Sequence, residues 1–143
     1  MWSMIGAACL TLAAIHGLIW LRQRAEWANA LFSVMAAGTA GLAAAELWMM
    51  RAETPAEFSA AVRWLHVPAW VIVLGVVGFV RVYLRAGRPW LAWTVVAVRT
   101  LSLVLNFAFA PNLNYREITA VRRIPFLGEP ISVAEGEIGR AHV

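Results

Sequence analysis

Apolar residues come in four long blocks along the chain, not in the alternating pattern of an amphipathic surface. The blocks cover residues 2–21, 27–50, 64–84 and 90–110, and the helices that they predict cover about 2–21, 27–50, 58–84 and 90–110. Each holds about 20 residues, and at about 1.5 Å of rise per residue such a helix matches the roughly 30 Å hydrocarbon core of a bilayer. Lipid offers no hydrogen-bond partners, so each block must satisfy its own backbone groups, as a helix does. The pattern predicts an all-α membrane protein, with a four-helix transmembrane bundle over residues 1–110.

Local signals refine the ends of these blocks. Thr54, Pro55 and Glu57 have the spacing of a helix N-terminus with a capping box, so the third helix is expected to begin before its apolar block. Pro68 is a candidate kink in that helix. The sequence from Gly87 to Pro89 breaks the chain before the fourth helix.

The tail over residues 111–136 has a different pattern. It mixes β-branched and charged residues and carries a turn signal over residues 126–130. This pattern predicts a loop or a short β-hairpin, placed outside the cytoplasm. A lone hairpin is marginal in water, so it must lean on the helices or on further chain.

Composition and charge support a membrane protein and exclude other classes. The 143 residues are 62% hydrophobic and only 14% charged, which is unlike a water-soluble domain. All 12 basic residues are Arg and the net charge is +4, but the arginines are scattered at block edges without a basic stripe, so nucleic acid is not an expected partner. Cys9 is the only cysteine, which excludes an internal disulfide and a cysteine-based metal cage.

The distribution of arginine predicts the orientation. The first and third connections, with the adjoining helix end, carry Arg22, Arg24, Arg81, Arg85 and Arg88. The positive-inside rule places these connections in the cytoplasm, and the N-terminus and the tail outside. Three tail arginines, Arg116, Arg122 and Arg123, count against this assignment. Membrane lipids are the expected partners, and arginines near the cytoplasmic ends should contact anionic head groups.

Four polar residues inside the blocks are the candidate intramembrane network. Arg99 lies in the middle of the fourth block, where an arginine costs roughly 2.5–3.5 kcal/mol unless it finds a partner inside the protein. Glu46 is the only carboxylate within a block, and His66 and Asn106 share its expected depth. We expect a Glu46–Arg99 pair completed by His66 or Asn106. It is either a structural ion pair, which is favoured, or a polar pocket through which a ligand, proton or lipid head group alters helix packing.

A second polar group follows the fourth block. It consists of Asn112, Asn114, Tyr115, Arg116 and Glu117. These residues are either a helix stop with a turn or the rim of a ligand site outside the membrane. The sequence contains no nucleophile–histidine arrangement and no phosphate loop, so no catalytic residue, metal or cofactor is predicted. His16 and His66 lie at different depths, and each is expected to be a hydrogen-bonded structural histidine.

Four runs of sequence carry a resemblance to a known family. They are residues 106–118 (NFAFAPNLNYREI), 124–136 (IPFLGEPISVAEG), 15–20 (IHGLIW) and 64–68 (WLHVP). Together they make nearly all of residues 1–136 similar to the N-terminal membrane sensory region of bacterial sensor histidine kinases. In that family the region is a bundle of about seven helices, often followed by a PAS domain and a kinase core.

The resemblance implies a role in two-component signal transduction. The chain would be the sensory input and anchor of a histidine kinase in a bacterial inner membrane, with ATP bound only in a kinase part outside the chain. Homodimerisation and contact with a response regulator would also use parts outside it. Residues 137–143 resemble a translated sequencing adapter, which makes the chain an expected fragment of a longer protein. The alternatives are a transporter, or a membrane redox subunit that binds quinone or haem, with Glu46 and Arg99 in the polar pathway.

Overall fold

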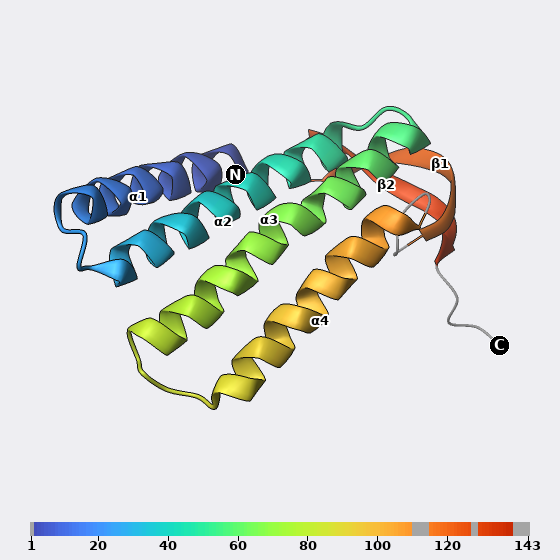
Figure 1. Cartoon of the computed structure of the whole chain (residues 1–143). Helices are drawn as coiled ribbons and strands as arrows, with labels where there is room; N and C mark the ends of the chain where they lie inside the picture. Colours follow the sequence, from blue (N-terminus) through green and yellow to red (C-terminus); the bar gives the residue numbers. More distant parts are fainter. Residues whose placement is uncertain (1, 110–114, 127–128, 139–143) are drawn as a thin grey trace.

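Four long helices and a two-stranded sheet make up the structure (Figure 1). The computed structural model describes residues 2–109, 115–126 and 129–138, and only the backbone of 115–117, 129 and 136–138. Its elements are α1 (Trp2–Arg22), α2 (Trp27–Arg51), α3 (Pro55–Val82), α4 (Pro89–Ala108), β1 (Tyr115–Phe126) and β2 (Glu129–Ile138). Each helix is long and apolar enough to cross a membrane. The chain is therefore consistent with a multi-pass membrane protein.

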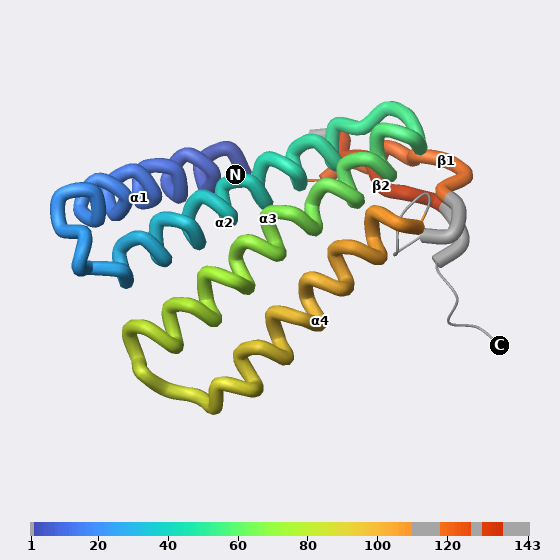
Figure 2. Tube along the Cα trace, in the orientation of Figure 1, coloured from blue at the N-terminus to red at the C-terminus, as the bar shows by residue number. Residues whose placement is uncertain are grey.

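The helices lie side by side in chain order as an open row, not as a closed four-helix bundle (Figures 1 and 2). α2 packs against both α1 and α3, whereas α4 packs mainly against α3. Large apolar side chains of the two outer helices stay exposed, among them Met4, Leu10, Leu18, Trp93, Val98 and Leu101. Lipid is as apolar as these side chains, so no hydrophobic force drives the row to close.

Small residues allow α2 and α3 to approach closely. A Cβ atom at Gly38 of α2 would lie 2.9 Å from Ile72 Cγ1, and one at Gly78 of α3 would lie 2.9 Å from Leu31 Cδ2. Such distances are too short for real Cβ atoms, so a side chain at either position would force its neighbour to shift. Leu31 can turn aside from Gly78, but the Pro68 carbonyl oxygen, 3.3 Å from the Cβ position of Gly38, is part of the backbone and cannot. Packing through small residues is a typical way for membrane helices to associate.

The helix boundaries confirm the predicted order of elements and shift three of the predicted ends by two or three residues. α3 begins at Pro55, three residues before the predicted helix start at residue 58, because Thr54 caps it by accepting a hydrogen bond from the Glu57 N–H at 3.2 Å. Glu57 Oε2 in turn accepts from the Glu53 N–H at 2.9 Å. α3 ends at Val82, before the connection in which Gly87 has a φ of 82°. α4 ends at Ala108.

The predicted hairpin is confirmed. β1 and β2 form an antiparallel sheet in which Ile124 faces Ile131 and Pro125 faces Pro130, with register shifts nearer its open end. β2 continues through Glu137 and Ile138, the first residues of the segment that resembles an adapter. Residues 139–143 lie outside the described residues.

The hairpin packs across the adjoining ends of α2 and α3. β1 contacts α3 and β2 contacts α2. A small core of Ala52, Phe58 and Val62 is covered by Val121 and Ala134, among other residues. The buried Ser132 hydroxyl donates to the Ala52 carbonyl at 2.6 Å. The helices thus give the hairpin the support that a lone hairpin lacks.

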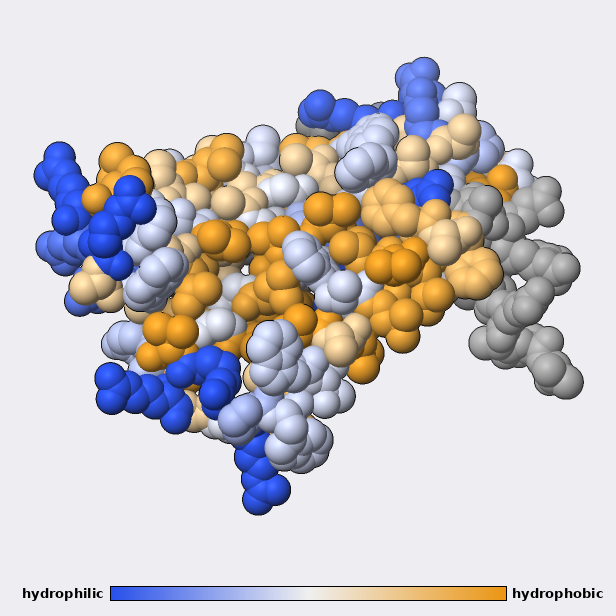
Figure 3. Space-filling model, viewed as in Figure 1, coloured by the Kyte–Doolittle hydropathy of each residue, from blue (hydrophilic) through white to orange (hydrophobic). Residues whose placement is uncertain are grey.

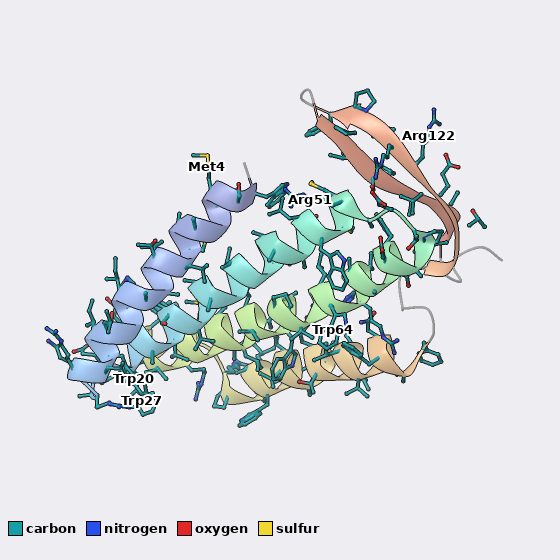
Figure 4. All side chains as sticks on the ribbon, turned by 90° about the horizontal axis from the view of Figure 1, so that it is seen from above. Met4, Trp20, Trp27, Arg51, Trp64 and Arg122 are labelled. Atoms are coloured by element: carbon teal, nitrogen blue, oxygen red, sulfur yellow. The ribbon has the colours of Figure 1, made fainter. Side chains whose placement is uncertain are left out.

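Hydrophilic residues gather at the two ends of the helices, and apolar residues cover the middle (Figure 3). Tryptophans lie near several helix ends, as an interfacial belt requires. Trp20 and Trp27 meet across the α1–α2 connection with ring centroids 5.6 Å apart, and the Arg24 guanidinium lies 4.4 Å from the Trp20 ring (Figure 4). This distribution fits a slab of hydrocarbon across the row.

Candidate functional site

The polar contacts between helices concentrate on the turn of α3 that precedes Pro68. Proline has no N–H, so Pro68 cannot donate to the Trp64 carbonyl, and the local helix loses a hydrogen bond. Side-chain donors contact three other carbonyls of this stretch. His66, which is 8% exposed, donates from Nδ1 to the Val62 carbonyl of its own helix at 3.1 Å.

α4 supplies two of these donors. The amide nitrogen of Asn106, a fully buried residue, donates to the Arg63 carbonyl at 3.0 Å. Arg99 Nη2 lies 3.5 Å from the His66 carbonyl, at the long limit of a hydrogen bond. The structure therefore joins three predicted network residues, Arg99, Asn106 and His66, at one turn of α3.

Arg63 makes the return contact from α3 to α4. Its guanidinium donates to the Phe107 carbonyl and lies 5.0 Å from the Phe107 ring centroid. Phe107 is one residue from the end of α4, where carbonyls lack intrahelical donors and the helix dipole is negative. Arg63 therefore acts as a cap for the C-terminus of α4.

Aromatic contacts complete this interface, which we call the α3–α4 seam: Arg63, Trp64, His66 and Trp70 of α3 with Arg99, Thr100, Asn106 and Phe107 of α4. Trp70 Nε1 donates to Thr100 Oγ1 at 2.9 Å. Trp64 meets Phe107 edge to face with ring centroids 5.4 Å apart, and its side chain lies between the two helices in Figure 4. The seam thus depends on directed contacts of large side chains.

Glu46 stays outside the seam. The ion pairs among the described residues are Arg122–Glu135 at 3.8 Å and Arg123–Glu53 at 2.8 Å, so the expected Glu46–Arg99 pair is not formed in that part of the chain. The physical reason is the open row: Glu46 belongs to α2 and Arg99 to α4, and α3 lies between these two helices. Equal depth in the membrane does not bring two residues together when another helix separates them.

The structure brings in residues that sequence reasoning did not select. Arg63 precedes the third apolar block by one residue and was not selected as a site residue, yet it lies in the third turn of α3. The capping signal at Thr54 could have revealed this, because a helix that starts at Pro55 puts Arg63 one turn before His66, on the same face. Trp70 and Thr100 carried no sequence signal beyond their helical placement.

His16 belongs to the α1–α2 interface. Its Nδ1 lies 2.8 Å from Asn29 Oδ1, and its ring packs against Phe32 at a centroid distance of 4.3 Å. His16 and His66 are thus hydrogen-bonded histidines in separate interfaces, as expected. Within the described residues, no group of three His, Cys, Asp or Glu side chains is placed to hold a metal ion.

An apolar groove of about 500 Å³ runs between α2 and α3. Gly38, Gly41 and Ala44 are among its small lining residues, and Trp48, Trp64 and Pro68 are among the large ones. Glu46 is not among the residues that line it. The groove therefore offers shape and apolar surface but no charge of its own.

The predicted outer rim cannot be placed. Asn112 and Asn114 lie outside the described residues, and for Tyr115, Arg116 and Glu117 only the backbone of β1 is described. Comparison of the chain with known protein families, with characterised proteins and with solved structures finds no match. The site must therefore be interpreted from its own geometry.

Proposed function

We propose that the chain is the membrane-embedded sensory input and anchor region of a sensor histidine kinase. The observation that carries the proposal is the α3–α4 seam. α4 is joined to the row by a few side-chain-to-backbone contacts from Asn106, Arg99 and Arg63, and its other faces are apolar. A helix held in this way can shift between two packing states when a stimulus changes those contacts.

Direction of signalling follows from the predicted topology. With connections one and three in the cytoplasm, α4 leads out of the inner membrane into the hairpin. About three further helices would return the chain to the cytoplasm, where a PAS domain and a kinase core would lie. A change in the position of α4 would pass through those helices to the output domain, and dimer and response-regulator contacts would be made there.

The transporter and redox alternatives receive less support. Both place Glu46 and Arg99 in one polar pathway, and in the described residues α3 separates the two side chains. A pathway through the row would need a polar residue of α2 facing the seam. The signalling proposal requires only the contacts between α3 and α4.

The genomic sequence downstream of the codon for Gly136 tests this function. We expect the reading frame to continue through further apolar spans into a module with a phosphoacceptor histidine and a glycine-rich ATP lid. A natural stop codon at the end of the 143 residues would overturn the proposal, because no kinase could then be attached.

Cysteine labelling tests the orientation independently. In a Cys9→Ala background, a membrane-impermeant maleimide should label Thr119→Cys in intact cells, because Thr119 is exposed on the hairpin. Ala86→Cys, in the exposed α3–α4 connection, should react only after the cells are opened. The reverse pattern would place the hairpin in the cytoplasm and contradict the proposed topology.

A further inference from the structure

Positive charge in the α3–α4 seam is not balanced by carboxylates. Arg63 and Arg99 each keep their charge at physiological pH. Neither belongs to an ion pair among the described residues. The acidic side chains nearest in the chain are engaged elsewhere, since Glu57 accepts from the Glu53 N–H and Glu53 pairs with Arg123. Among the side chains that the structure describes, no carboxylate neutralises the two guanidinium groups of the seam.

Both guanidinium groups also keep unused donors. The Nε atoms of Arg63 and Arg99 are buried and have no hydrogen-bond partner in the described part of the chain. A guanidinium offers five N–H donors, and within the same residues each of these two groups makes a single hydrogen bond, to a backbone carbonyl. A buried, unsatisfied donor costs free energy, and a buried charge costs more. The missing partner should therefore supply several acceptor oxygens and a negative charge.

The position of the seam indicates how such a partner reaches it. Arg63 contacts Phe107, one residue before the end of α4, and Arg99 extends from mid-helix to the carbonyl of His66, one turn from Arg63 on α3. The neighbouring apolar side chains of α4 are open, with Leu101 and Val104 each 57% exposed. An anion bound here would lie near the end of α4 with lipid-facing surface beside it. This is the depth at which arginines that extend toward a membrane surface meet head groups.

From this arrangement we propose that the α3–α4 seam binds the phosphate of an anionic phospholipid between Arg63 and Arg99. Phosphate oxygens accept bidentate hydrogen bonds from guanidinium groups, and the acyl chains lie along the exposed apolar surface of α4. The lipid links the two helices and changes how firmly α4 is held. The inference requires the membrane location but not the kinase, so it can fail while the signalling proposal stands, and the reverse.

Native mass spectrometry and thermal unfolding of the full chain test the proposal. The protein is placed in nanodiscs of phosphatidylcholine alone or mixed with phosphatidylglycerol. We expect phosphatidylglycerol to raise the Tm and to remain bound as one molecule per chain. Arg63→Gln and Arg99→Gln should each weaken this retention at least about tenfold, because a hydrogen bond to a charged group is lost.

Arg51→Gln is the matched control, since Arg51 is an exposed arginine at the C-terminal end of α2 and lies outside the seam. It removes the same charge and should leave retention within about twofold of the parent chain. Equal losses in Arg51→Gln and Arg99→Gln would overturn the site in favour of general surface charge. Equal stabilisation by inorganic phosphate in phosphatidylcholine nanodiscs would overturn the lipid in favour of a soluble anion.

Arg99→Lys keeps the test decisive if the glutamine variant does not fold. Lysine preserves the charge but not the planar fork, so retention should fall while the protein stays folded. Unchanged retention in a folded Arg99→Lys protein, together with unchanged retention in Arg63→Gln, would exclude bidentate binding at the seam.

Discussion

The two sides of α3 are built in different ways. Toward α2 the contact is dry and close, because Gly38, Gly41 and Gly78 let backbones and short side chains approach. Toward α4 the contact uses large polar and aromatic side chains such as Asn106 and Trp70. The first interface is fixed by shape, whereas the second depends on individual hydrogen bonds.

This difference assigns different roles to the helices of one row. Steric packing has few alternatives, since moving α2 along α3 would drive Gly38 out of register with Ile72. Hydrogen bonds between membrane helices contribute only about 0.6 kcal/mol on average, so individual contacts of this kind hold a helix weakly. The hairpin further stabilises the pair of α2 and α3, because it packs on both helices. α2, α3 and the hairpin thus form a fixed unit, and α4 is the element most easily moved.

Gly38→Val should have the largest effect on stability, because it changes the α2–α3 interface, which is fixed by shape. The added Cβ would lie 2.9 Å from Ile72 Cγ1 and 3.3 Å from the Pro68 carbonyl oxygen, and the backbone atom cannot turn away. Overpacking of this kind costs about 1–3 kcal/mol or more, so we expect lower yield of folded protein and a lower Tm.

Gly6→Ala is the control for this prediction. Its Cβ would meet Ala43 Cβ at 3.8 Å, an ordinary contact between α1 and α2. The Tm of this variant should remain close to that of the parent chain. If Gly38→Val were tolerated as well as Gly6→Ala, the close α2–α3 packing would not be the rigid part of the molecule.

Much of the helical layer was predictable from the sequence. Block length and hydropathy indicate the number of helices, since a span must be long enough and apolar enough for the bilayer. The capping signal at Thr54 and the antiparallel hairpin of the tail also appear as expected in the structure. These features depend on residues that are close together in the sequence, so the sequence is enough to predict them.

Lateral order was not predictable in the same way. The apolar blocks do not indicate whether four helices close into a bundle or lie in a row, because lipid can cover an apolar face that no other helix covers. For this reason the expected Glu46–Arg99 pair is not formed. The depth of a residue in the membrane can be estimated from the sequence, but its neighbours on other helices cannot. Arg63 was overlooked because its charge looked like that of a loop residue, although the helix that holds it had already begun.

Asn106→Leu tests the seam itself and should have an intermediate effect. Leucine preserves much of the volume of this fully buried residue but cannot donate to the Arg63 carbonyl. Hydrogen bonds between membrane helices contribute about 0.6 kcal/mol on average and up to about 1.7 kcal/mol. We expect amide hydrogen exchange to rise across α4 and to stay unchanged in α2.

Thr94→Val is the control on α4. Thr94 is exposed, and its hydroxyl donates to the Trp90 carbonyl of its own helix at 2.8 Å, so no contact between helices is removed. Exchange across α4 should then match that of the parent chain. An equal rise in α2 and α4 for Asn106→Leu would show that the row opens as one unit and that α4 is not separately mobile.

Ser132→Ala should have the smallest and most local effect, because it concerns the hairpin that reinforces the fixed unit. The change removes the buried hydrogen bond of 2.6 Å to the Ala52 carbonyl, worth about 0.5–1.5 kcal/mol. Proteolysis of the hairpin should become faster while the Tm of the helices changes little.

Arg123→Gln is the comparison for this prediction. Its ion pair with Glu53 is 2.8 Å long, but the two side chains are 55% and 73% exposed, so solvent and salt screen the pair. A larger effect from Arg123→Gln than from Ser132→Ala would mean that surface charge, not buried contact with α2, attaches the hairpin and thereby stabilises the fixed unit.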